Sequence, residues 1–317
     1  MITAARVAYL GPSGTFTEAA ARAMRTGHVG ELVAMNDAGE IAGAVEAGEF
    51  TFGVVPIENS VHGTVLPTLD ELVFTRESVL VREEIVIEVT FTLFRNPAST
   101  ATATRVLSHP AGLQQCRGEI ARRGLTSIET SSTAEACRLV GGEQPDALCI
   151  AAPHAGIEYG LVPIAEMIQD RDGGRTRFYV LAKQLAFHDG DMDGFHTALV
   201  LTPGRDRAGI LLDMLRPFAE RGLNLSSLMS RPLRSGLGLY CFIVTVDAHV
   251  DAPRFGAAIS ELLDGGVRVK NLGSYLAWPA AEQTAGAHAE YPAGSVAASD
   301  SALAHQRVLA PPHDQVR

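Results

Sequence analysis

The chain has 317 residues, of which 46% are hydrophobic and 20% charged, a composition typical of globular proteins and a length sufficient for two or three domains. The net charge of −10 argues against a nucleic-acid-binding protein, which normally has a basic surface, but it permits a local site for an anion. No apolar run approaches the ~20 residues of a membrane span, and the first ten residues lack a signal-peptide core, so we expect a cytoplasmic protein.

The first expected strand covers residues 7–10 and ends in a glycine-rich turn at residues 11–14. The spacing of Thr15 and Glu18 matches a capping box and predicts a helix over residues 19–24. A helix that begins directly after a strand presents free backbone N–H groups to an anion, although an ordinary turn is the alternative. The patterns GxGxxG and GxxxxGK[ST] are both absent, which argues against the common phosphate-binding loops.

A polar loop at residues 56–65 follows a short helix at 39–48 and a strand at 52–55. The strand is apolar without alternation, as in a parallel sheet covered on both faces. Loops at the carboxyl ends of such strands bind ligands in open α/β sheets, so Asn59, Ser60 and Thr64 are candidate hydrogen-bonding groups. A turn-forming role is the alternative for Ser60.

The next segments predict a second lobe that interrupts the first. A helix at 66–74 and strands within 80–94 complete the first part, and the small, polar residues 96–104 link to the second lobe. Its expected strands cover 104–107, 126–129 and 146–151, and its expected helices cover 110–123, 134–140 and 153–159. Ser108 and His109 lie where a strand meets a helix, so they are ligand-contact candidates, with helix capping the alternative for His109. Residues 161–165 lead back, which suggests two lobes with the site in the cleft between them.

The return path contains a hydroxyl flanked by two cations. Gly173 and Gly174 precede Arg175, Thr176 and Arg177, and an apolar strand is expected over residues 178–182. Such a stretch is suited to holding an anion and donating a hydrogen bond to it. A loop with solvated arginines is the alternative.

A third unit follows an acidic segment at residues 187–194. Strands are expected at 197–202, 223–232, 239–247 and 267–276, and helices at 209–223 and 255–263. The order βαββαβ is that of the ferredoxin-like fold. Residues 279–317, rich in Ala, Gly, Ser, Pro and His, predict a disordered tail.

The cysteines are scattered and no CxxC pair occurs. We therefore expect buried, reduced thiols and no structural zinc site at Cys116, Cys137, Cys149 and Cys241.

Several motifs occur in the order that they have in prephenate dehydratases, a family that this chain resembles over about residues 5–277. The motifs are Gly11–Glu18, Val55–Ser60 with Gly63 and Thr64, Ser108–Pro110, Ser132–Ala136 and Thr176–Phe178. The third unit resembles the ACT domain of the same enzymes. Gly209–Leu212 stands where that family has Gly-Ala-Leu-Val, and Asn224 and Leu225 precede Ser230–Pro232.

The resemblance implies an α/β catalytic region of two lobes, similar to type 2 periplasmic binding proteins, plus an α+β ferredoxin-like ACT domain. The catalytic region covers residues 1–186, with lobe one at about 1–95 and 165–186 and lobe two at about 96–164; the ACT domain covers 195–278, and the tail 279–317. It also implies that prephenate is converted to phenylpyruvate, water and carbon dioxide without a metal or other cofactor, and that phenylalanine inhibits a homodimer or homotetramer. Arogenate dehydratase and a non-catalytic amino-acid sensor are the alternatives.

Site residues carry over from the family motifs. Thr176 takes the role of the catalytic residue, as a hydrogen-bond donor to the leaving hydroxyl. The candidate substrate contacts are Ser13, Thr15, Asn59, Ser60, Thr64, Ser108, His109, Arg177 and Phe178, with binding of a carboxylate and bracing of the loop equally open for Arg177. The candidate phenylalanine contacts are Gly209, Ile210, Leu211, Asn224, Leu225, Ser230 and Arg231. Gly174, Ile210 and Met229 depart from the family pattern, in which Asn, Ala and Glu are usual at these positions.

Overall fold

The computed structural model describes residues 5–26, 29–183, 194–234 and 238–279, all within the unit that spans residues 1–283. The predicted tail, apart from Pro279, and the predicted acidic segment, apart from Gly194, lie outside the described residues. None of the described helices is long and apolar enough to cross a membrane.

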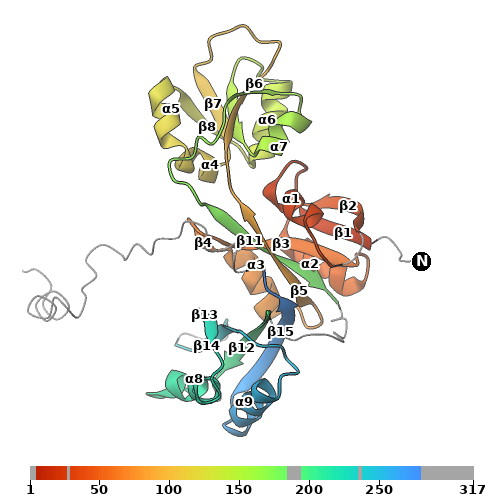
Figure 1. Ribbon diagram of the computed structural model, residues 1–317, viewed down its shortest axis with the longest axis vertical. Coiled ribbons are helices and arrows are strands. Elements are labelled where there is room, and N and C mark those ends of the chain that lie inside the picture. Colours follow the sequence, from red (N-terminus) through yellow and green to blue (C-terminus); the bar gives the residue numbers. More distant parts are fainter. Residues whose placement is uncertain (1–4, 27–28, 184–193, 235–237, 280–317) are drawn as a thin grey trace, which may run out of the picture. The chain divides into compact units, whose positions relative to one another are not determined.

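Lobe one is a mixed sheet covered by helices (Figure 1). Its strands are β1 (Ala5–Leu10), β2 (Val29–Met35), β3 (Phe52–Asn59), β4 (Gly63–Thr64), β5 (Leu80–Glu88) and β11 (Arg175–Ala182). Its helices are α1 (Phe16–Arg22), α2 (Ala38–Ala47), α3 (Leu66–Asp70) and the π-helical turn η1 (Glu71–Thr75). The order is β5-β11-β3-β1-β2, with β1 parallel to β2 and β3, and β11 antiparallel to β3 and β5.

Local signals explain most of these elements. Thr15 accepts a hydrogen bond from the backbone N–H of Glu18 and Asp37 accepts one from that of Glu40, so α1 and α2 begin directly after their caps. The helix predicted from residue 19 therefore begins at Phe16. Strand β2 was not predicted from the sequence, because it is an edge strand with a partly exposed, irregular pattern of side chains.

Lobe two is a five-stranded sheet in the order β10-β6-β9-β7-β8. Its elements are β6 (Thr92–Arg95), β7 (Arg105–Ser108), α4 (Pro110–Gln115), α5 (Arg117–Arg123), β8 (Thr126–Glu129), α6 (Thr133–Gly141), β9 (Leu148–Ala151), α7 (Pro153–Glu158) and β10 (Val162–Ala165). The helix predicted over 110–123 is broken at Cys116. Asp170 on the return path binds at this break: its N–H donates to the carbonyl of Gln115 at 2.6 Å, and its carboxylate accepts from the N–H of Gly118 at 2.9 Å.

The C-terminal region, residues 194–279, has the predicted βαββαβ order. Its elements are β12 (Phe195–Thr202), α8 (Ile210–Glu220), β13 (Leu225–Pro232), β14 (Tyr240–Val246), α9 (Pro253–Asp264) and β15 (Arg268–Leu276). Strand β15 meets β5 at Leu276 and Glu83, which joins this region to lobe one in a ten-stranded sheet. Gly273 permits this contact, because a Cβ atom there would lie 2.3 Å from the carbonyl oxygen of Val81.

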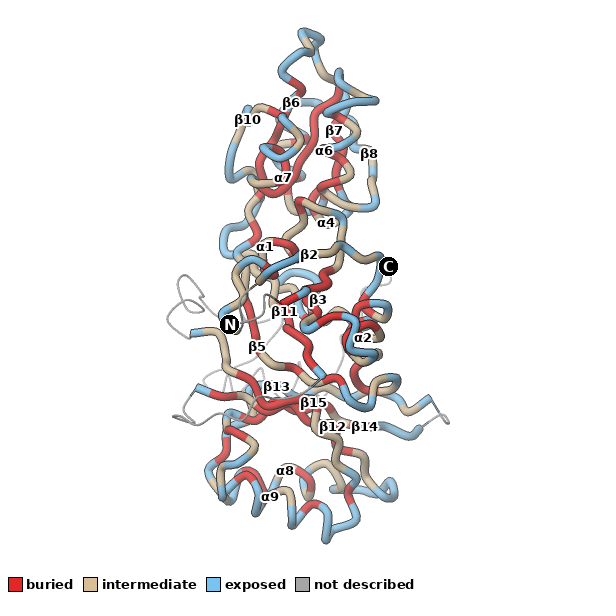
Figure 2. The backbone as a smooth tube through the Cα atoms, turned by 90° about the vertical axis from the view of Figure 1, so that its right-hand side faces the viewer, coloured by how far each residue is buried: buried red, intermediate tan, exposed pale blue. Residues whose placement is uncertain are grey.

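Lobe one and the C-terminal region share a hydrophobic core. Val81 and Leu181 of lobe one belong to the same buried cluster as Val200, Leu272 and Tyr275. Buried residues follow the strands on both sides of this junction, whereas α8 and α9 expose much of their surface (Figure 2). The C-terminal region is therefore packed against lobe one rather than tethered to it.

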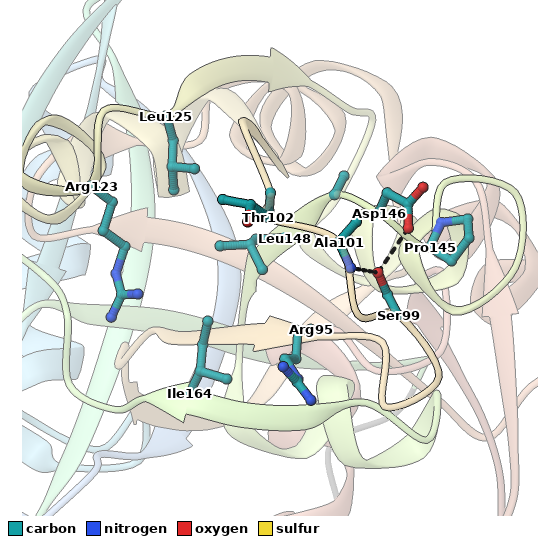
Figure 3. Close-up of a pocket in the computed structure, with 12 residues that line it drawn as sticks. Arg95, Ser99, Ala101, Thr102, Arg123, Leu125, Pro145, Asp146, Leu148 and Ile164 are labelled. Atoms are coloured by element: carbon teal, nitrogen blue, oxygen red, sulfur yellow. Dashed lines mark hydrogen bonds between the residues drawn. The ribbon is translucent and has the colours of Figure 1, made fainter.

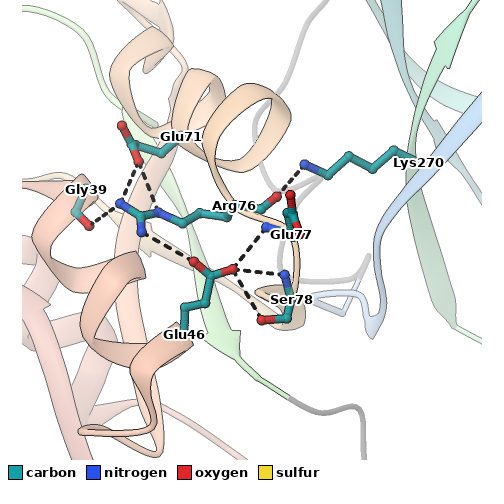
Figure 4. Close-up of polar contacts among 7 residues, drawn as sticks. All are labelled: Gly39, Glu46, Glu71, Arg76, Glu77, Ser78 and Lys270. Carbon is teal, nitrogen blue, oxygen red and sulfur yellow. Dashed lines mark hydrogen bonds and ion pairs between the residues drawn. The ribbon is translucent and has the colours of Figure 1, made fainter.

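Polar contacts add to this junction. The Lys270 ammonium donates to the backbone oxygens of Leu72 and Val73 at 2.8 and 3.0 Å. It also donates to the backbone oxygen of Arg76 at 2.5 Å (Figure 4), so β15 caps the end of η1. Burial lowers the pKa of Lys270. The pKa of nearby Glu46 is lowered to about 2. Its carboxylate accepts hydrogen bonds from the N–H of Ser78, the N–H of Glu77, the Arg76 guanidinium and the Ser78 hydroxyl (Figure 4).

All four cysteines are buried and free, as predicted. Burial raises the pKa of the Cys116 thiol to about 12, so this thiol stays protonated and unreactive at neutral pH.

Candidate active site

A cavity of about 250 Å³ brings residues of both lobes together. Its wall contains Leu10, Gly11, Thr15, Phe16, Thr17, Pro56, Asn59, Val89, Phe91, His109, Ala111, Gly112, Gln115, Ser131, Ser132, Thr133, Thr176 and Phe178. Five of the predicted site residues are among them: Thr15, Asn59, His109, Thr176 and Phe178. The chain thus assembles motifs from distant parts of the sequence around one space.

Two larger cavities lack this convergence. One of about 450 Å³ lies at the amino ends of β7, β8 and β9, with Arg95, Arg123 and Asp146 in its wall (Figure 3). It contains none of the predicted site residues, and parallel strands present their ligand sites at the opposite, carboxyl ends. The other, of about 300 Å³, belongs to the C-terminal region.

Helix starts supply the electrostatics of the candidate active site. Helices α1, α4 and α6 begin at its wall, with Thr15, His109 and Ser132 as their cap residues. The wall contains neither lysine nor arginine among the described residues. The caps accept the N–H groups of Glu18, Ala111 and Glu135. The other first-turn N–H groups and the helix dipoles favour negative charge, so the cavity is suited to an anion held by neutral donors.

Asn59 orients the hydroxyl of Thr176. The two residues are register partners on β3 and β11, and Asn59 Nδ2 lies 2.9 Å from Thr176 Oγ1. Asn59 Oδ1 accepts the backbone N–H groups of Val61 and His62 at 2.9 and 3.0 Å, which fixes the orientation of the amide. The Thr176 oxygen is therefore an acceptor for Asn59. Because no described residue accepts the Thr176 hydroxyl proton, that proton is available to a ligand in the cavity.

Arg177 lies on the other face of β11. Strand β11 begins at Arg175, and successive side chains of a strand point to opposite faces, so Thr176 and Phe178 face the cavity while Arg177 faces away. Arg177 contacts Glu58 at 3.2 Å and Glu84 at 3.6 Å. Burial acts to lower the pKa of Arg177, but the charges of Glu84 and Glu58 outweigh it and raise the pKa. This arrangement favours bracing over binding of a substrate carboxylate.

His109 presents a neutral donor to the cavity. Its Nδ1 accepts the N–H of Ala111 at 3.2 Å, so the proton of the neutral ring is on Nε2. Burial lowers the pKa of His109, and nearby His62 lowers it further against the opposing effect of Glu129. The ring is therefore uncharged at neutral pH and able to donate from Nε2.

Four other candidates do not line the cavity. The buried Ser108 hydroxyl donates to the carbonyl of Ile150 at 2.7 Å. Ser13 Oγ lies 2.9 Å from a carboxylate oxygen of Glu18 and 2.7 Å from one of Glu158, which links the lobes.

The remaining two belong to the loop after β3. Ser60 Oγ accepts the N–H of Arg175 at 2.9 Å, and Ser60 N–H donates to the carbonyl of Arg175, which fastens the loop to β11. Thr64 pairs with Glu58 in the short strand β4. These two residues support the hairpin of β3 and β4, in which Asn59 is the last residue of β3.

Sequence reasoning missed part of the wall, namely Phe91, Gln115, Ser131 and Thr133. Gln115 faces lobe one, with its Nε2 3.5 Å from Nε2 of His62. Ser131 and Thr133 follow β8 as His109 follows β7, and this repetition of polar residues after a strand was the signal that would have identified them.

The candidate phenylalanine contacts fall into separate groups. Gly209, with φ of 80°, precedes α8, Leu211 packs on the core, and Ile210 lines the cavity of about 300 Å³ together with Leu239 and Tyr240. The others lie on or beside β13: Asn224, which donates to Asp247 at 2.6 Å, Leu225, Ser230, and Arg231, which forms a bidentate pair with Asp70 of α3.

Comparisons with known proteins identify the family of the chain. Residues 7–186 match the family model described as prephenate dehydratase. The bifunctional chorismate mutase/prephenate dehydratase of Stutzerimonas stutzeri is 34% identical over 273 residues, which cover 85% of this chain and 73% of that protein.

Solved structures agree with this match. The prephenate dehydratase of Arthrobacter aurescens in complex with L-Phe has a TM-score of 0.78 and 30% identity, over 96% of this chain and 98% of that one. GqqA, described as a novel type of quorum quenching acylase, has a TM-score of 0.78 and 26% identity, over 87% and 99% of the two chains. The family model matches more than half of the sequence, and the chain belongs to the prephenate dehydratase family of enzymes.

Proposed function

We propose that this chain is a prephenate dehydratase that converts prephenate to phenylpyruvate, carbon dioxide and water. The observation that carries the proposal is the Thr176 hydroxyl in the cavity, with its oxygen engaged by Asn59 and its proton available. The family membership of residues 7–186 agrees with it.

The cavity is suited to this substrate. Prephenate is a dianion with an apolar ring, and the ring fits a wall that contains Phe16, Phe91 and Phe178. The carboxylates would lie at the starts of α1, α4 and α6, where N–H groups, hydroxyls and His109 Nε2 are donors. Binding in a fixed geometry aligns the two bonds that break.

The reaction needs little covalent help from the protein. The bond between the ring and its carboxylate breaks, carbon dioxide leaves, and the electron pair passes through the ring and displaces the hydroxyl on the far side. Thr176 donates a hydrogen bond to the oxygen on which negative charge develops. That oxygen leaves as hydroxide and takes a proton from solvent to become water, and the aromatic ring of phenylpyruvate makes the reaction favourable.

The proposed organisation assigns catalysis to residues 1–186 and regulation to residues 195–278. In the first part, two segments cross between lobes as in type 2 periplasmic binding proteins, after β5 and after β10. In the second, the βαββαβ order supports an ACT domain. Exposed Leu212, Leu228 and Leu239 support its self-association in a homo-oligomer.

Turnover of prephenate tests the activity. The purified full-length protein is expected to produce phenylpyruvate, measured by its ultraviolet absorbance in base, with prephenate preferred over arogenate. A higher rate on arogenate would contradict the substrate assignment. No turnover of either compound would contradict the dehydratase, and hydrolysis of an N-acyl amide in that case would point to the acylase relative.

Phenylalanine is the proposed inhibitor. The Arthrobacter aurescens relative was crystallised with L-Phe, and the effector candidates of this chain lie in the C-terminal region. Calorimetry is expected to detect binding of L-phenylalanine, and turnover is expected to fall as it is added. Absence of both heat and inhibition would contradict regulation by phenylalanine. The test matters for this chain because Met229 and Ile210 replace the Glu and Ala that are usual in the family.

A further inference from the structure

We propose that Glu84 is a positioning residue for the catalytic strand β11 and that it acts through Arg177. This inference rests on the proposed function, because the group that it positions is Thr176. Glu84 lies on β5, does not line the candidate active site, and belongs to none of the motifs that identify the family.

Burial makes the Glu84 charge effective. Its side chain is 1% exposed, and its Oε2 lies 3.6 Å from Arg177 Nε. These two atoms are buried and have no hydrogen-bond partner among the described residues, so each depends on the charge of the other. Glu58, the other partner of Arg177, is 48% exposed, and water and salt screen that contact. Glu84 is therefore the stronger electrostatic anchor of Arg177.

The contact acts beside the catalytic hydroxyl. Arg177 pairs in register with Glu58 on β3 and with Val86 on β5, so its guanidinium ties β11 to both neighbouring strands. The next register pair on the β3 side is Thr176 with Asn59, whose side chains are 2.9 Å apart. A small displacement of Arg177 would change that contact, because Thr176 is the adjacent residue of the same rigid strand.

The C-terminal region faces the same carboxylate. His196 of β12 has its Nδ1 4.0 Å from Glu84 Oε2 and its Nε2 3.3 Å from Asp247 Oδ1. Other described groups near Glu84 are the hydroxyls of Tyr179 and Tyr275, which are hydrogen-bonded to each other, the backbone N–H of Trp278, which donates to Oε1, and the Arg25 guanidinium, which donates to the Glu84 carbonyl. Glu84 thus lies where lobe one, β11 and the C-terminal region meet.

The adjacent residue provides a matched control. Glu83 is also fully buried, but its carboxylate binds Arg25 and Thr26 on the other face of β5. Glu84→Gln is expected to lower kcat for prephenate about 10-fold and to change KM less than 2-fold, because the helix starts that hold the carboxylates stay in place while Thr176 shifts. Glu83→Gln is expected to lower the melting temperature and to leave kcat within about 2-fold. Equal kcat losses in the two variants would overturn the proposal.

A double-mutant cycle tests the route. If Glu84 acts through Arg177, Glu84→Gln lowers kcat no further in an Arg177→Gln background, whereas multiplied losses would overturn the route.

Hydrogen exchange tests the inference whatever the substrate is. Exchange at the amides of residues 175–178 is expected to rise in Glu84→Gln and not in Glu83→Gln. Equal exchange would overturn the inference, while a wild-type protein without prephenate turnover would overturn only the proposed function.

Discussion

Thr176→Val is expected to lower kcat for prephenate at least about 100-fold. Valine keeps the shape and the strand preference of threonine but removes the hydroxyl. The departing oxygen loses its donor, and Asn59 Nδ2 loses its acceptor at 2.9 Å. KM is expected to change little, since the helix starts hold the carboxylates. Steady-state kinetics with prephenate measure both constants.

Thr176→Ser is the matched control. It keeps a hydroxyl at the same position and is expected to retain activity within about 10-fold of the wild type. A valine variant as active as the serine variant would contradict the role of the hydroxyl. A fall in kcat with a loss of folded protein, seen by circular dichroism, would indicate a structural effect instead.

Asn59→Asp is expected to lower kcat at least about 30-fold at neutral pH. The introduced carboxylate still accepts the N–H groups of Val61 and His62, but it cannot donate to Thr176. The Thr176 hydroxyl then donates to the carboxylate and turns its proton away from the cavity. A negative charge beside a dianionic substrate adds to the loss.

The pH dependence gives this variant a signature. Protonation removes the added charge and restores a donor, so the ratio of variant to wild-type kcat is expected to rise as pH falls toward about 4. The matched control is Asn96→Asp in lobe two, where Asn96 Nδ2 donates to the carbonyls of Val140 and Gly141 and its Oδ1 accepts the N–H of Ala98. That substitution is expected to lower stability without this kinetic effect. The same loss of kcat in both variants would contradict the role of Asn59.

Local signals were sufficient for most of the fold. The capping box at Thr15 and apolar runs such as β9 depend on nearby residues, so the sequence alone predicted them. Two features depend on distant partners and were missed. The break at Cys116 has Asp170, 54 residues along the chain, bound across it, and β2 pairs with β1.

The candidate site shows the same division. Motif residues after strand ends did converge, as Thr15, Asn59 and His109 demonstrate. The expected cluster of a hydroxyl with two cations did not form, because β11 begins at Arg175 rather than Phe178 and its alternation places Arg177 on the far face. The direction of a side chain at a strand end depends on the residue at which strand pairing begins. For β11 that residue is set by pairing with β3 and β5, which are distant in the sequence, so local patterns could not predict it.

The crystal structure of the protein with an unreactive mimic of prephenate tests the central claim most directly. The expected result is that the ring of the mimic lies in the cavity of about 250 Å³, with Thr176 Oγ1 within ~3.2 Å of the ring hydroxyl and the carboxylates at the helix starts. Binding of the mimic elsewhere, or in the cavity with its hydroxyl remote from Thr176, would contradict the claim.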